Sequence, residues 1–352
     1  MNPGKVCVCV PAYDRPEMLT QLIHTFSKQD YANKELIVSD DSPNDRVQRV
    51  VKDLADPCIK YIKNSVNLGL TRNSLQVLKM AQGSYVILLG DDDLFVSEHA
   101  ISAYVHVFEK HPSVMYVNSN GAQFSNELRI ENVYRYFRRD TLFHSGEESM
   151  KGIWTTAINM SGIGVRNTLD LDRLYPHEHL LFPQLEHVGH LINRGDSYGI
   201  ASELVGIRAH PGQLGYRAIK GELIKGGETH GVIELFNIFR KLQSQYDLDY
   251  SDDFLARQLV NRYSMNLLKE RLIVGRRLVR ANCENFRLAS PRAKKSLKLR
   301  ISYYVSQIMP RGVIRLLRFL YLAMVRWRHR QAIAALGDSL SKIVADPHGR
   351  YQ

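Results

Sequence analysis

The N-terminal part of the chain alternates short apolar runs with amphipathic segments. Four runs have the length and composition of buried strands: 6–10, 35–39, 59–63 and 85–89. The segments between them carry apolar residues at helical spacing: 18–26, 47–54 and 71–81. Because strands that alternate with helices usually form a parallel sheet, this pattern predicts an α/β domain with a mainly parallel sheet flanked by helices.

Polar clusters follow three of these strands. They are Ala12-Tyr13-Asp14, Asp40-Asp41-Ser42 and Asp91-Asp92-Asp93. Ligands of open α/β sheets bind at the carboxyl ends of the strands, so we expect the three clusters to line one crevice.

The three consecutive carboxylates after the fourth strand need positive charge nearby, because they raise one another's pKa values. Mg²⁺ and Mn²⁺ prefer oxygen ligands and commonly bind one or two carboxylates together with substrate phosphates. Two structural alternatives are open: the acidic run can cap a following helix, and Asp40-Asp41 can form an Asx turn. The first strand is followed by Pro-Ala-Tyr-Asp-Arg-Pro without a glycine-rich phosphate loop, which argues against dehydrogenases, kinases and nucleotidyl transferases.

The chain has 352 residues, 44% of them hydrophobic, enough for one large domain and an appendage. From about residue 221 the apolar spacing becomes helical, over 232–242, 254–268 and 271–279. We therefore expect a catalytic domain at 1–218 and a basic helical region at 219–352.

Positive charge is concentrated in this second region. The net charge is +11, and residues 261–330 contain 18 Lys or Arg against two Glu. At 100° per residue, 312–328 separates a basic side (Arg311, Arg315, Arg318, Arg326) from an apolar side (Val313, Leu317, Leu320, Met324, Trp327). This pattern favours an anionic membrane surface over nucleic acid as a partner, with an ordinary packed helix as the alternative.

The four cysteines Cys7, Cys9, Cys58 and Cys283 show neither a CxxC pair nor metal-ligand spacing. We interpret them as small core residues in a reducing compartment. The first apolar run is too short for a signal peptide, and no uncharged apolar stretch of 18 residues occurs. We expect a cytoplasmic protein that associates peripherally with the inner face of the cell membrane.

Two segments carry a family resemblance: VCVCVPAYDRPEMLTQLIHTFSKQDYANKELIVSDDSPND and NSVNLGLTRNSLQVLKMAQGSYVILLGDDDLF. They resemble the family 2 inverting nucleotide-sugar glycosyltransferases over about residues 4–125, and the similarity thins out towards about residue 215. The resemblance implies the GT-A fold, in which two Rossmann-like halves abut. It also implies transfer of a sugar from a nucleoside diphosphate, with uridine the expected base, to a polysaccharide or lipid-linked acceptor.

The resemblance assigns the donor site residue by residue. The segment that lines the base and ribose corresponds to Pro11, Ala12, Tyr13 and Asp14. Asp41 corresponds to the carboxylate that holds the base. The stretch beside the diphosphate corresponds to Asn67, Gly69, Arg72 and Asn73.

The resemblance also implies a Mn²⁺ or Mg²⁺ cofactor. Gly90 stands at the first position of the family's Asp-x-Asp-Asp pattern, which leaves three carboxylates for the ion. We expect Asp93 as the direct ligand, with Asp91 or Asp92 engaging ribose or an ordered water. Asp91 is also a metal candidate. In the segment SELVGIRAHPGQLG, His210 can complete the coordination and Arg208 can face phosphate.

The catalytic base of the family is usually an acid near a helix start in the second half of the domain. Here the matching stretch is LYPHEHLLFPQLEHVGHL, in which Glu178 is the expected base, His179 replaces a second acid, and Glu186 is a rival. Because Gly90 and His179 stand where acids are expected, a catalytically degenerate protein that binds nucleotide sugars or acts as a scaffold is the alternative function.

Overall fold

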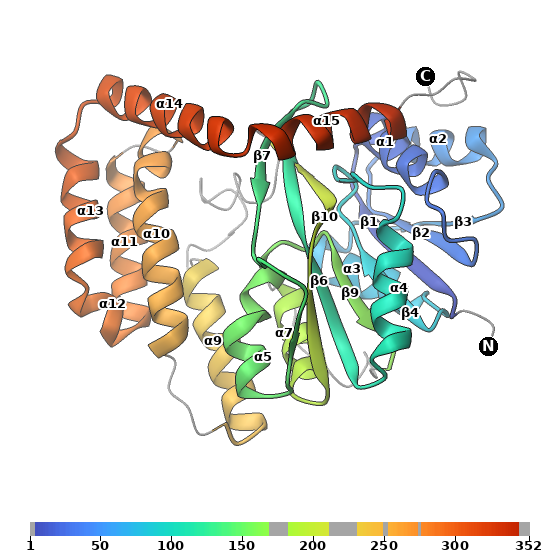
Figure 1. Ribbon diagram of the computed structural model, residues 1–352, viewed down its shortest axis with the longest axis horizontal. Coiled ribbons are helices and arrows are strands. Elements are labelled where there is room, and N and C mark those ends of the chain that lie inside the picture. Colours follow the sequence, from blue (N-terminus) through green and yellow to red (C-terminus); the bar gives the residue numbers. More distant parts are fainter. Residues whose placement is uncertain (1–3, 169–181, 211–230, 249–252, 274–275, 345–352) are drawn as a thin grey trace. The chain divides into compact units, whose positions relative to one another are not determined.

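The computed structural model describes residues 4–168, 182–210, 231–248, 253–273 and 276–344 (Figure 1). Contacts divide the chain into two compact units. The first contains residues 1–209 together with 330–352, and the second contains residues 210–329.

The first unit is built on a ten-stranded sheet whose main path runs β3-β2-β1-β4-β9-β6-β10-β5. Strands β1 (Val6–Ala12), β2 (Lys34–Asp40), β3 (Ile59–Lys63) and β4 (Tyr85–Leu88) pair in parallel. The second half is mixed, because β9 (Ile163–Arg166) runs antiparallel between β4 and β6 (Val114–Phe124). The remaining strands are β5 (Leu94–Phe95), β7 (Ile130–Tyr134), β8 (Thr141–Phe143) and β10 (Asp196–Arg208).

Helices cover both faces of this sheet, as the sequence predicts. Val6, Val8 and Val10 alternate along β1 and are fully buried on one face, in a core shared with α1 (Pro16–Ser27), α2 (Arg46–Leu54) and α4 (Ala100–Lys110). On the opposite face, the Cys9 thiol lies 3.5 Å from the carbonyl oxygen of Val77 in α3 (Gly69–Lys79). Because successive side chains of a strand point to opposite faces of the sheet, β1 lies in the middle layer, with helices packed on both sides. The predicted α/β class is confirmed.

The shorter helices of the first unit are α5 (Glu147–Gly152), the 3₁₀ helix η1 (Trp154–Ile158) and α7 (Pro183–Ile192). The expectation about cysteines needs one correction. Cys7, Cys9 and Cys283 are buried, whereas Cys58 is exposed just before β3.

Helix α15 (Arg330–Val344) completes the core of the first unit (Figure 1). Leu340 is 1% exposed within that core, and Ile333 and Leu336 pack against it. The Ser339 hydroxyl donates to the backbone oxygen of Val96 at 2.9 Å. The observed units therefore differ from the division expected at residue 218, because the last helix belongs with the sheet.

The second unit is helical, as the sequence predicts. It contains α9 (Gly231–Gln245), α10 (Asp253–Ile273), α11 (Arg276–Ala289), α12 (Pro291–Lys295), α13 (Leu297–Ile308) and α14 (Arg311–Arg328). Its core includes Phe236, Phe239 and Phe286, all fully buried. Among the helices that the structure describes, none is both long and apolar enough to cross a membrane.

Candidate active site

The polar ends of three adjacent strands meet at one edge of the sheet. The main chain of Asp41 donates to the carbonyl oxygen of Ala12 at 3.0 Å. The main chain of Asp14 donates to the Ser42 hydroxyl at 2.8 Å. The Tyr13 amide donates to a carboxylate oxygen of Asp91 at 2.8 Å. These hydrogen bonds join the ends of β2, β1 and β4 into a single polar site, as the topology predicts.

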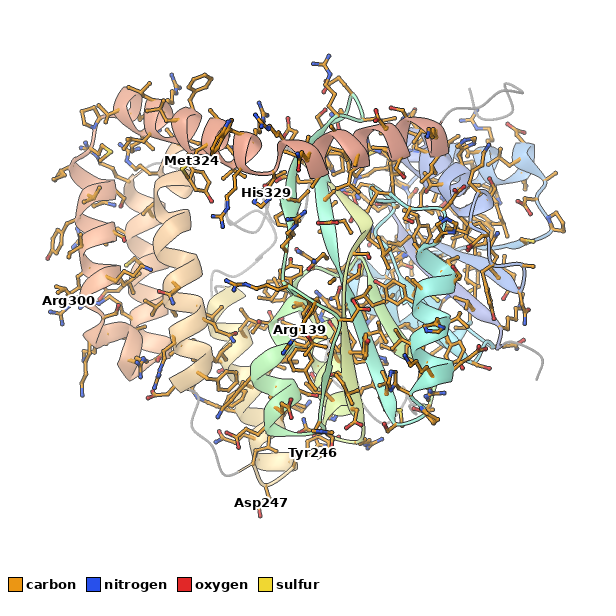
Figure 2. All side chains as sticks on the ribbon, viewed as in Figure 1. Arg139, Tyr246, Asp247, Arg300, Met324 and His329 are labelled. Carbon is orange, nitrogen blue, oxygen red and sulfur yellow. The ribbon has the colours of Figure 1, made fainter. Side chains whose placement is uncertain are left out.

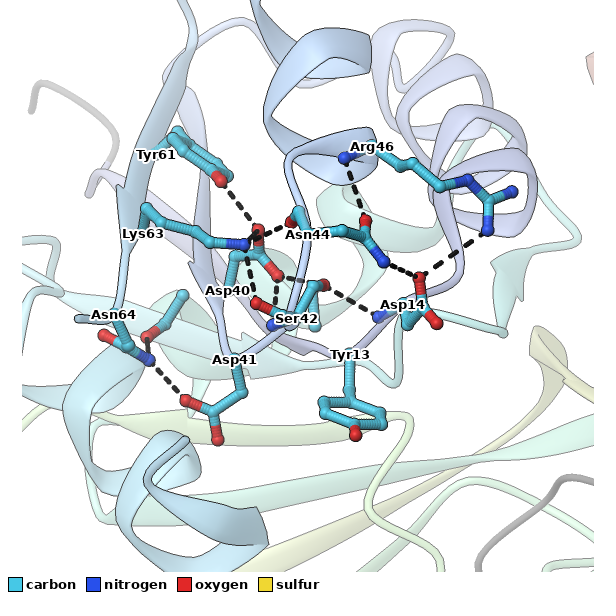
Figure 3. Close-up of polar contacts among 12 residues, drawn as sticks. Tyr13, Asp14, Asp40, Asp41, Ser42, Asn44, Arg46, Tyr61, Lys63 and Asn64 are labelled. Carbon is cyan, nitrogen blue, oxygen red and sulfur yellow. Dashed lines mark hydrogen bonds and ion pairs between the residues drawn. The ribbon is translucent and has the colours of Figure 1, made fainter. Parts of the chain in front are cut away.

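The turn after β2 is held by the fully buried carboxylate of Asp40 (Figure 3). It accepts hydrogen bonds from the Ser42 amide at 2.8 Å, from the Tyr61 hydroxyl at 2.6 Å and from Lys63 Nζ at 3.2 Å. Lys63 also donates to the Ser42 carbonyl oxygen at 2.7 Å. The Asx turn weighed from the sequence therefore exists, and Asp40 forms it.

Its neighbour Asp41 points to α3 instead. Asp41 Oδ1 accepts from Asn64 Nδ2 at 2.7 Å and from the Leu68 amide at 3.2 Å. Asn64 also donates to Asn73 Oδ1 at 3.1 Å, and Asn73 lies 3.4 Å from the carbonyl oxygen of Ala12. This network fixes the Asp41 carboxylate in one orientation beside the end of β1.

The start of α3 lies next to this network. The Asn67 side chain accepts from the Gly69 amide at 2.8 Å, and Gly69 has a φ of +76°, a conformation that favours glycine. Arg72 is exposed on the first turns of α3, whereas Asn73 is buried. Leu68, between Asn67 and Gly69, donates to Asp41, and Asn73 is linked to Asp41 through Asn64, whereas Arg72 is exposed.

Asp91, Asp92 and Asp93 form a tight turn between β4 and β5. Arg15 Nη1 lies 2.6 Å from Asp91 Oδ1 and 3.7 Å from Asp92 Oδ2. Asp93 Oδ2 accepts from the Ser161 hydroxyl at 2.5 Å, and Asp93 Oδ1 accepts from the Arg208 amide at 2.7 Å. A strand follows the turn, so the alternative in which the acidic run caps a helix is wrong.

Gly90 allows the close packing of side chains in this turn. A Cβ atom on Gly90 would lie 2.7 Å from Asp92 Oδ1, 3.3 Å from Asp93 Oδ2 and 3.4 Å from Ser161 Oγ. The Gly90 amide also donates to Ser161 Oγ at 2.8 Å. An acid was expected at this position. The glycine found there instead leaves room for the other carboxylates to pack closely around Ser161.

Known proteins match this arrangement in sequence and fold. The family model of glycosyl transferase family 2 matches residues 7–169, which contain all three polar strand ends. Residues 7–169 are therefore the part of the chain that matches family 2, and we call them the family 2 domain.

Two curated relatives resemble the family 2 domain. One is a GalNAc(5)-diNAcBac-PP-undecaprenol beta-1,3-glucosyltransferase of Campylobacter jejuni, 35% identical over 114 residues, which are 30% of this chain and 37% of the relative. The other is the UDP-Glc:alpha-D-GlcNAc-diphosphoundecaprenol beta-1,3-glucosyltransferase WfgD of Escherichia coli, 28% identical over 118 residues, which are 34% of this chain and 47% of the relative. The chain thus spans less than half the length of each of these relatives.

A solved structure supports the GT-A fold of the family 2 domain. S. aureus TarS 1–349 in complex with UDP-GlcNAc superimposes with a TM-score of 0.56 at 16% identity, over 86% of this chain and 90% of that one. Since the identity is low, this likeness concerns the fold.

Two carboxyls of the acidic turn in the family 2 domain have raised pKa values. Burial raises the pKa of Asp91 to about 6, although Arg15 opposes the shift, and Asp92 adds to it. Burial and then Asp92 raise the pKa of Asp93 well above its ordinary value, despite the hydrogen bonds from Ser161 and Arg208. Carboxyls that resist ionisation beside two arginines can accommodate a further cation, so these residues fit Mn²⁺ or Mg²⁺.

Side chains alone do not complete a metal site here. Within the described parts of the chain, no three His, Cys, Asp or Glu side chains have the arrangement of a preformed metal site. Magnesium-type ions are commonly bound by one or two carboxylates together with substrate phosphates. The acidic turn therefore fits a cation that arrives with a diphosphate.

Arg208 has a different place from the one expected. Its side chain is buried, with Nε donating to the Asp92 carbonyl oxygen at 2.8 Å and Nη2 donating to Gln21 at 2.6 Å. The guanidinium also stacks 4.6 Å from the centre of the Phe124 ring. Arg208 thus holds the acidic turn from inside the protein, and the expectation that it faces phosphate is not met.

The residues expected to act at the acceptor side are less well placed. Glu178 and His179 lie outside the described residues. Glu186 is 3% exposed in α7 and lies 3.8 Å from His190. His210, which was expected instead to complete the metal coordination, is buried at the start of the second compact unit.

The sequence analysis did not identify two residues that contact the acidic turn, Arg15 and Ser161. Arg15 lies directly after the segment assigned to the base, and its charge beside three acids was a usable signal. Ser161 precedes β9, 68 positions after Asp93, and no local pattern marks it.

Proposed function

We propose that the chain transfers a sugar from a nucleoside diphosphate, uridine diphosphate by family resemblance, to a glycan or lipid-linked acceptor with inversion. The observation that carries this proposal is the joining of Tyr13, Asp41 and Asp91 at one sheet edge by hydrogen bonds. Tyr13 is 44% exposed there and offers a ring face to a base. Asp41 offers a fixed carboxylate to base or ribose donors.

The acidic turn would hold the cation and the diphosphate. Mn²⁺ or Mg²⁺ bound there would supply positive charge to the departing nucleoside diphosphate. The Asp92 side chain is 12% exposed and that of Asp91 is 3% exposed. Since Asp93 is also fixed by Ser161 and Arg208, these contacts favour Asp92 over Asp93 as the outward-facing ligand.

Inversion requires a base that removes the proton of the acceptor hydroxyl while the leaving group departs from the opposite face of the sugar. Glu178 remains the proposed base, with His179 beside it and Glu186 as the rival. Glu178→Gln should retain donor binding and lose turnover. A Glu178→Gln protein with wild-type turnover would exclude this assignment.

A thermal-shift screen of nucleoside diphosphates and nucleotide sugars, with and without Mn²⁺, tests the donor site. A ligand at about 100 times its Kd stabilises the folded protein by about 2.7 kcal/mol. We expect UDP with Mn²⁺ to raise the melting temperature, and Asp41→Asn and Asp92→Asn to reduce that rise. A wild-type protein that no nucleotide stabilises would refute the donor site.

The alternative function, a degenerate nucleotide-sugar-binding or scaffold protein, rests on Gly90 and His179. The packing around Gly90 leaves three ordered carboxylates in the turn, which supports an active enzyme. Hydrolysis of a panel of nucleotide sugars with Mn²⁺ separates the two functions. Donor binding without hydrolysis or transfer would favour the scaffold.

We also propose that the second unit docks on an anionic membrane surface, at the inner face of the cell membrane. Twelve of the fifteen large apolar side chains that are exposed in the described part of the chain lie on α13 and α14. On α14, Leu320 is 53%, Met324 56% and Trp327 69% exposed, whereas Ile314 of the same helix is 1% exposed. The apolar side predicted from the sequence is therefore turned to solvent, unlike that of a packed helix.

Charge favours an anionic surface. No acidic residue occurs between Glu284 and Asp338, a stretch that includes both helices and many Arg and Lys residues. Arg300 projects outward from α13 (Figure 2). Exposed apolar side chains among basic ones are typical of helices that lie in the headgroup region of anionic bilayers.

Vesicle flotation of the full chain tests this docking. We expect binding to phosphatidylglycerol-containing vesicles and weak binding to phosphatidylcholine vesicles. Leu320→Ser with Met324→Ser should reduce binding, while Leu288→Ser, at a position 74% exposed on α11, serves as the matched control. Equal partitioning of all three proteins would refute the docking surface.

A further inference from the structure

The acidic turn continues directly into β5, the two-residue strand at one end of the main sheet path. Strand β5 pairs with β10 at two positions, Leu94 with Gly206 and Phe95 with Val205. So short a pairing provides few backbone hydrogen bonds. The position of the residues just after Asp93 therefore depends on the other elements that pack against them.

Three elements hold the end of β5 and the residue after it by the main chain. The Val96 amide donates to the Leu204 carbonyl oxygen of β10 at 3.0 Å, and the Phe95 amide donates to the Thr25 hydroxyl of α1 at 3.3 Å. The Val96 carbonyl oxygen accepts from the Ser339 hydroxyl of α15 at 2.9 Å. Because Val96 is fully buried, its carbonyl oxygen needs a partner from the protein. Ser339 provides that partner from 243 positions further along the chain.

Ser339 lies on the apolar face of α15. Leu336, Ser339 and Ile343 follow one another at helical spacing, with Leu340 beside them. Leu340 is 1% and Ile343 4% exposed, and Leu336 packs against the core that contains β5. A hydroxyl group on such a face loses water when the helix packs, and the hydrogen bond to Val96 compensates for that loss. The packing of α15 is therefore coupled to the position of the Val96 carbonyl group.

A second set of contacts leads from α15 to the same turn. Helix α15 packs on α1, as Figure 1 also shows. On α1, Gln21 accepts from Arg208 Nη2 at 2.6 Å, and Arg208 Nε donates to the Asp92 carbonyl oxygen at 2.8 Å. Helix α15 thus supports the acidic turn at Asp92 through α1, and just after Asp93 through Ser339. Since α15 lies outside residues 7–169, this support is not part of the family 2 domain.

We propose that Ser339 is a positioning residue, which keeps the acidic turn in the conformation that accepts a divalent cation together with a diphosphate. Its hydroxyl group binds Val96 behind the turn, so it acts through Val96 and not on the donor. The ligands of the turn rest on the proposed function, whereas the positioning of the turn by α15 does not. Two measurements on the full-length protein test these two parts.

Hydrogen–deuterium exchange without ligand measures the turn alone. Ser339→Ala should increase local opening of the peptide 90–98 about tenfold, the factor that corresponds to one hydrogen bond. Ser339→Thr, which keeps the hydroxyl group, should exchange like the wild type. Ser341→Ala, at an exposed position of the same helix, makes the same change in helix propensity and is the matched control. Unchanged exchange in Ser339→Ala would overturn the proposal.

Donor binding is measured by calorimetric titration with UDP and Mn²⁺, and by saturation-transfer NMR with uridine, which carries no diphosphate. Ser339→Ala should weaken the binding of UDP with Mn²⁺ about five- to tenfold and raise the Mn²⁺ concentration needed for half-maximal binding. Its affinity for uridine should equal that of the wild type. Equal losses for uridine and for UDP with Mn²⁺ would indicate general destabilisation and would overturn the positioning role.

The two measurements also separate this inference from the proposed function. A wild type that does not bind UDP with Mn²⁺, together with faster exchange in Ser339→Ala, would refute the donor site and retain the positioning of the turn. A wild type and a Ser339→Ala protein that bind UDP with Mn²⁺ equally well would retain the donor site and refute the inference.

Discussion

Replacing Ser161 by alanine should destabilise the first unit, because one hydroxyl group serves both sides of the acidic turn. Ser161 is 8% exposed. It donates to Asp93 Oδ2 at 2.5 Å and accepts from the Gly90 amide at 2.8 Å. Ser161→Ala removes both hydrogen bonds without adding bulk. The resulting decrease in the free energy of unfolding therefore measures how strongly these bonds hold the turn.

The size of this destabilisation follows from the two groups that lose their partner, the Asp93 carboxylate and the Gly90 amide. A hydrogen bond to a charged group contributes about 1.5–3 kcal/mol, and a buried N–H without a partner costs about 1–3 kcal/mol. These effects share one atom and do not simply add. We expect Ser161→Ala to lower the free energy of unfolding by about 3 kcal/mol.

Urea unfolding followed by tryptophan fluorescence measures this loss. The chain has two tryptophans, Trp154, which is fully buried in the first unit, and Trp327, which is 69% exposed in the second. In a Trp327→Phe background the signal therefore reports on the first unit alone.

Ser102→Ala is the matched control. Its hydroxyl also donates to a carboxylate, Asp30 Oδ2, at 3.1 Å, but in an exposed position. Its loss should stay within about 0.5 kcal/mol, as for most surface substitutions. A Ser161→Ala protein no less stable than Ser102→Ala would refute the described role of the serine.

Three further predictions concern packing and charge. Gly90→Ala places a methyl group 2.7 Å from Asp92 Oδ1 and should weaken stabilisation by UDP with Mn²⁺, whereas Gly312→Ala, with open space around it, should not. Burial, with His190 beside it, lowers the pKa of His187 from 6.5 to about 4, so acid favours the unfolded chain, which binds more protons. Between pH 7 and pH 5 the wild type should lose about 2 kcal/mol more of its unfolding free energy than His187→Leu, and equal losses would contradict this. Lys63→Met leaves the fully buried carboxylate at 3.2 Å without its cation and should cost about 3 kcal/mol in urea unfolding, while a neutral result would contradict the ion pair.

The parallel half of the sheet could be predicted because each of its strands and helices has a recognisable local sequence pattern. The run at 6–10 is rich in β-branched residues and ends at a proline, and the helix after it begins at Pro16, where a proline suits the first turn. Once β1, β2 and β4 are parallel neighbours, their polar ends must lie at one edge. Asp41 and Asp91 could therefore be placed together from the sequence alone.

The other contacts of the site depend on segments far apart in the chain. Strand β9 enters antiparallel between β4 and β6, and no local pattern in residues 163–166 marks that position. Ser161 reaches Asp93 only because β9 lies there. Arg208 was misassigned because its charge is visible in the sequence, but its burial against Phe124 is not.

The return of α15 to the first unit makes the helical unit an insertion in the topological sense. The chain leaves the first unit after residue 209 and re-enters it at residue 330, so its core draws on both ends of the sequence. A protein cut before Arg330 would lose Leu340 and leave an uncovered apolar surface beside β7 and α1. During synthesis, that part of the core likewise has to wait for the last helix to emerge from the ribosome.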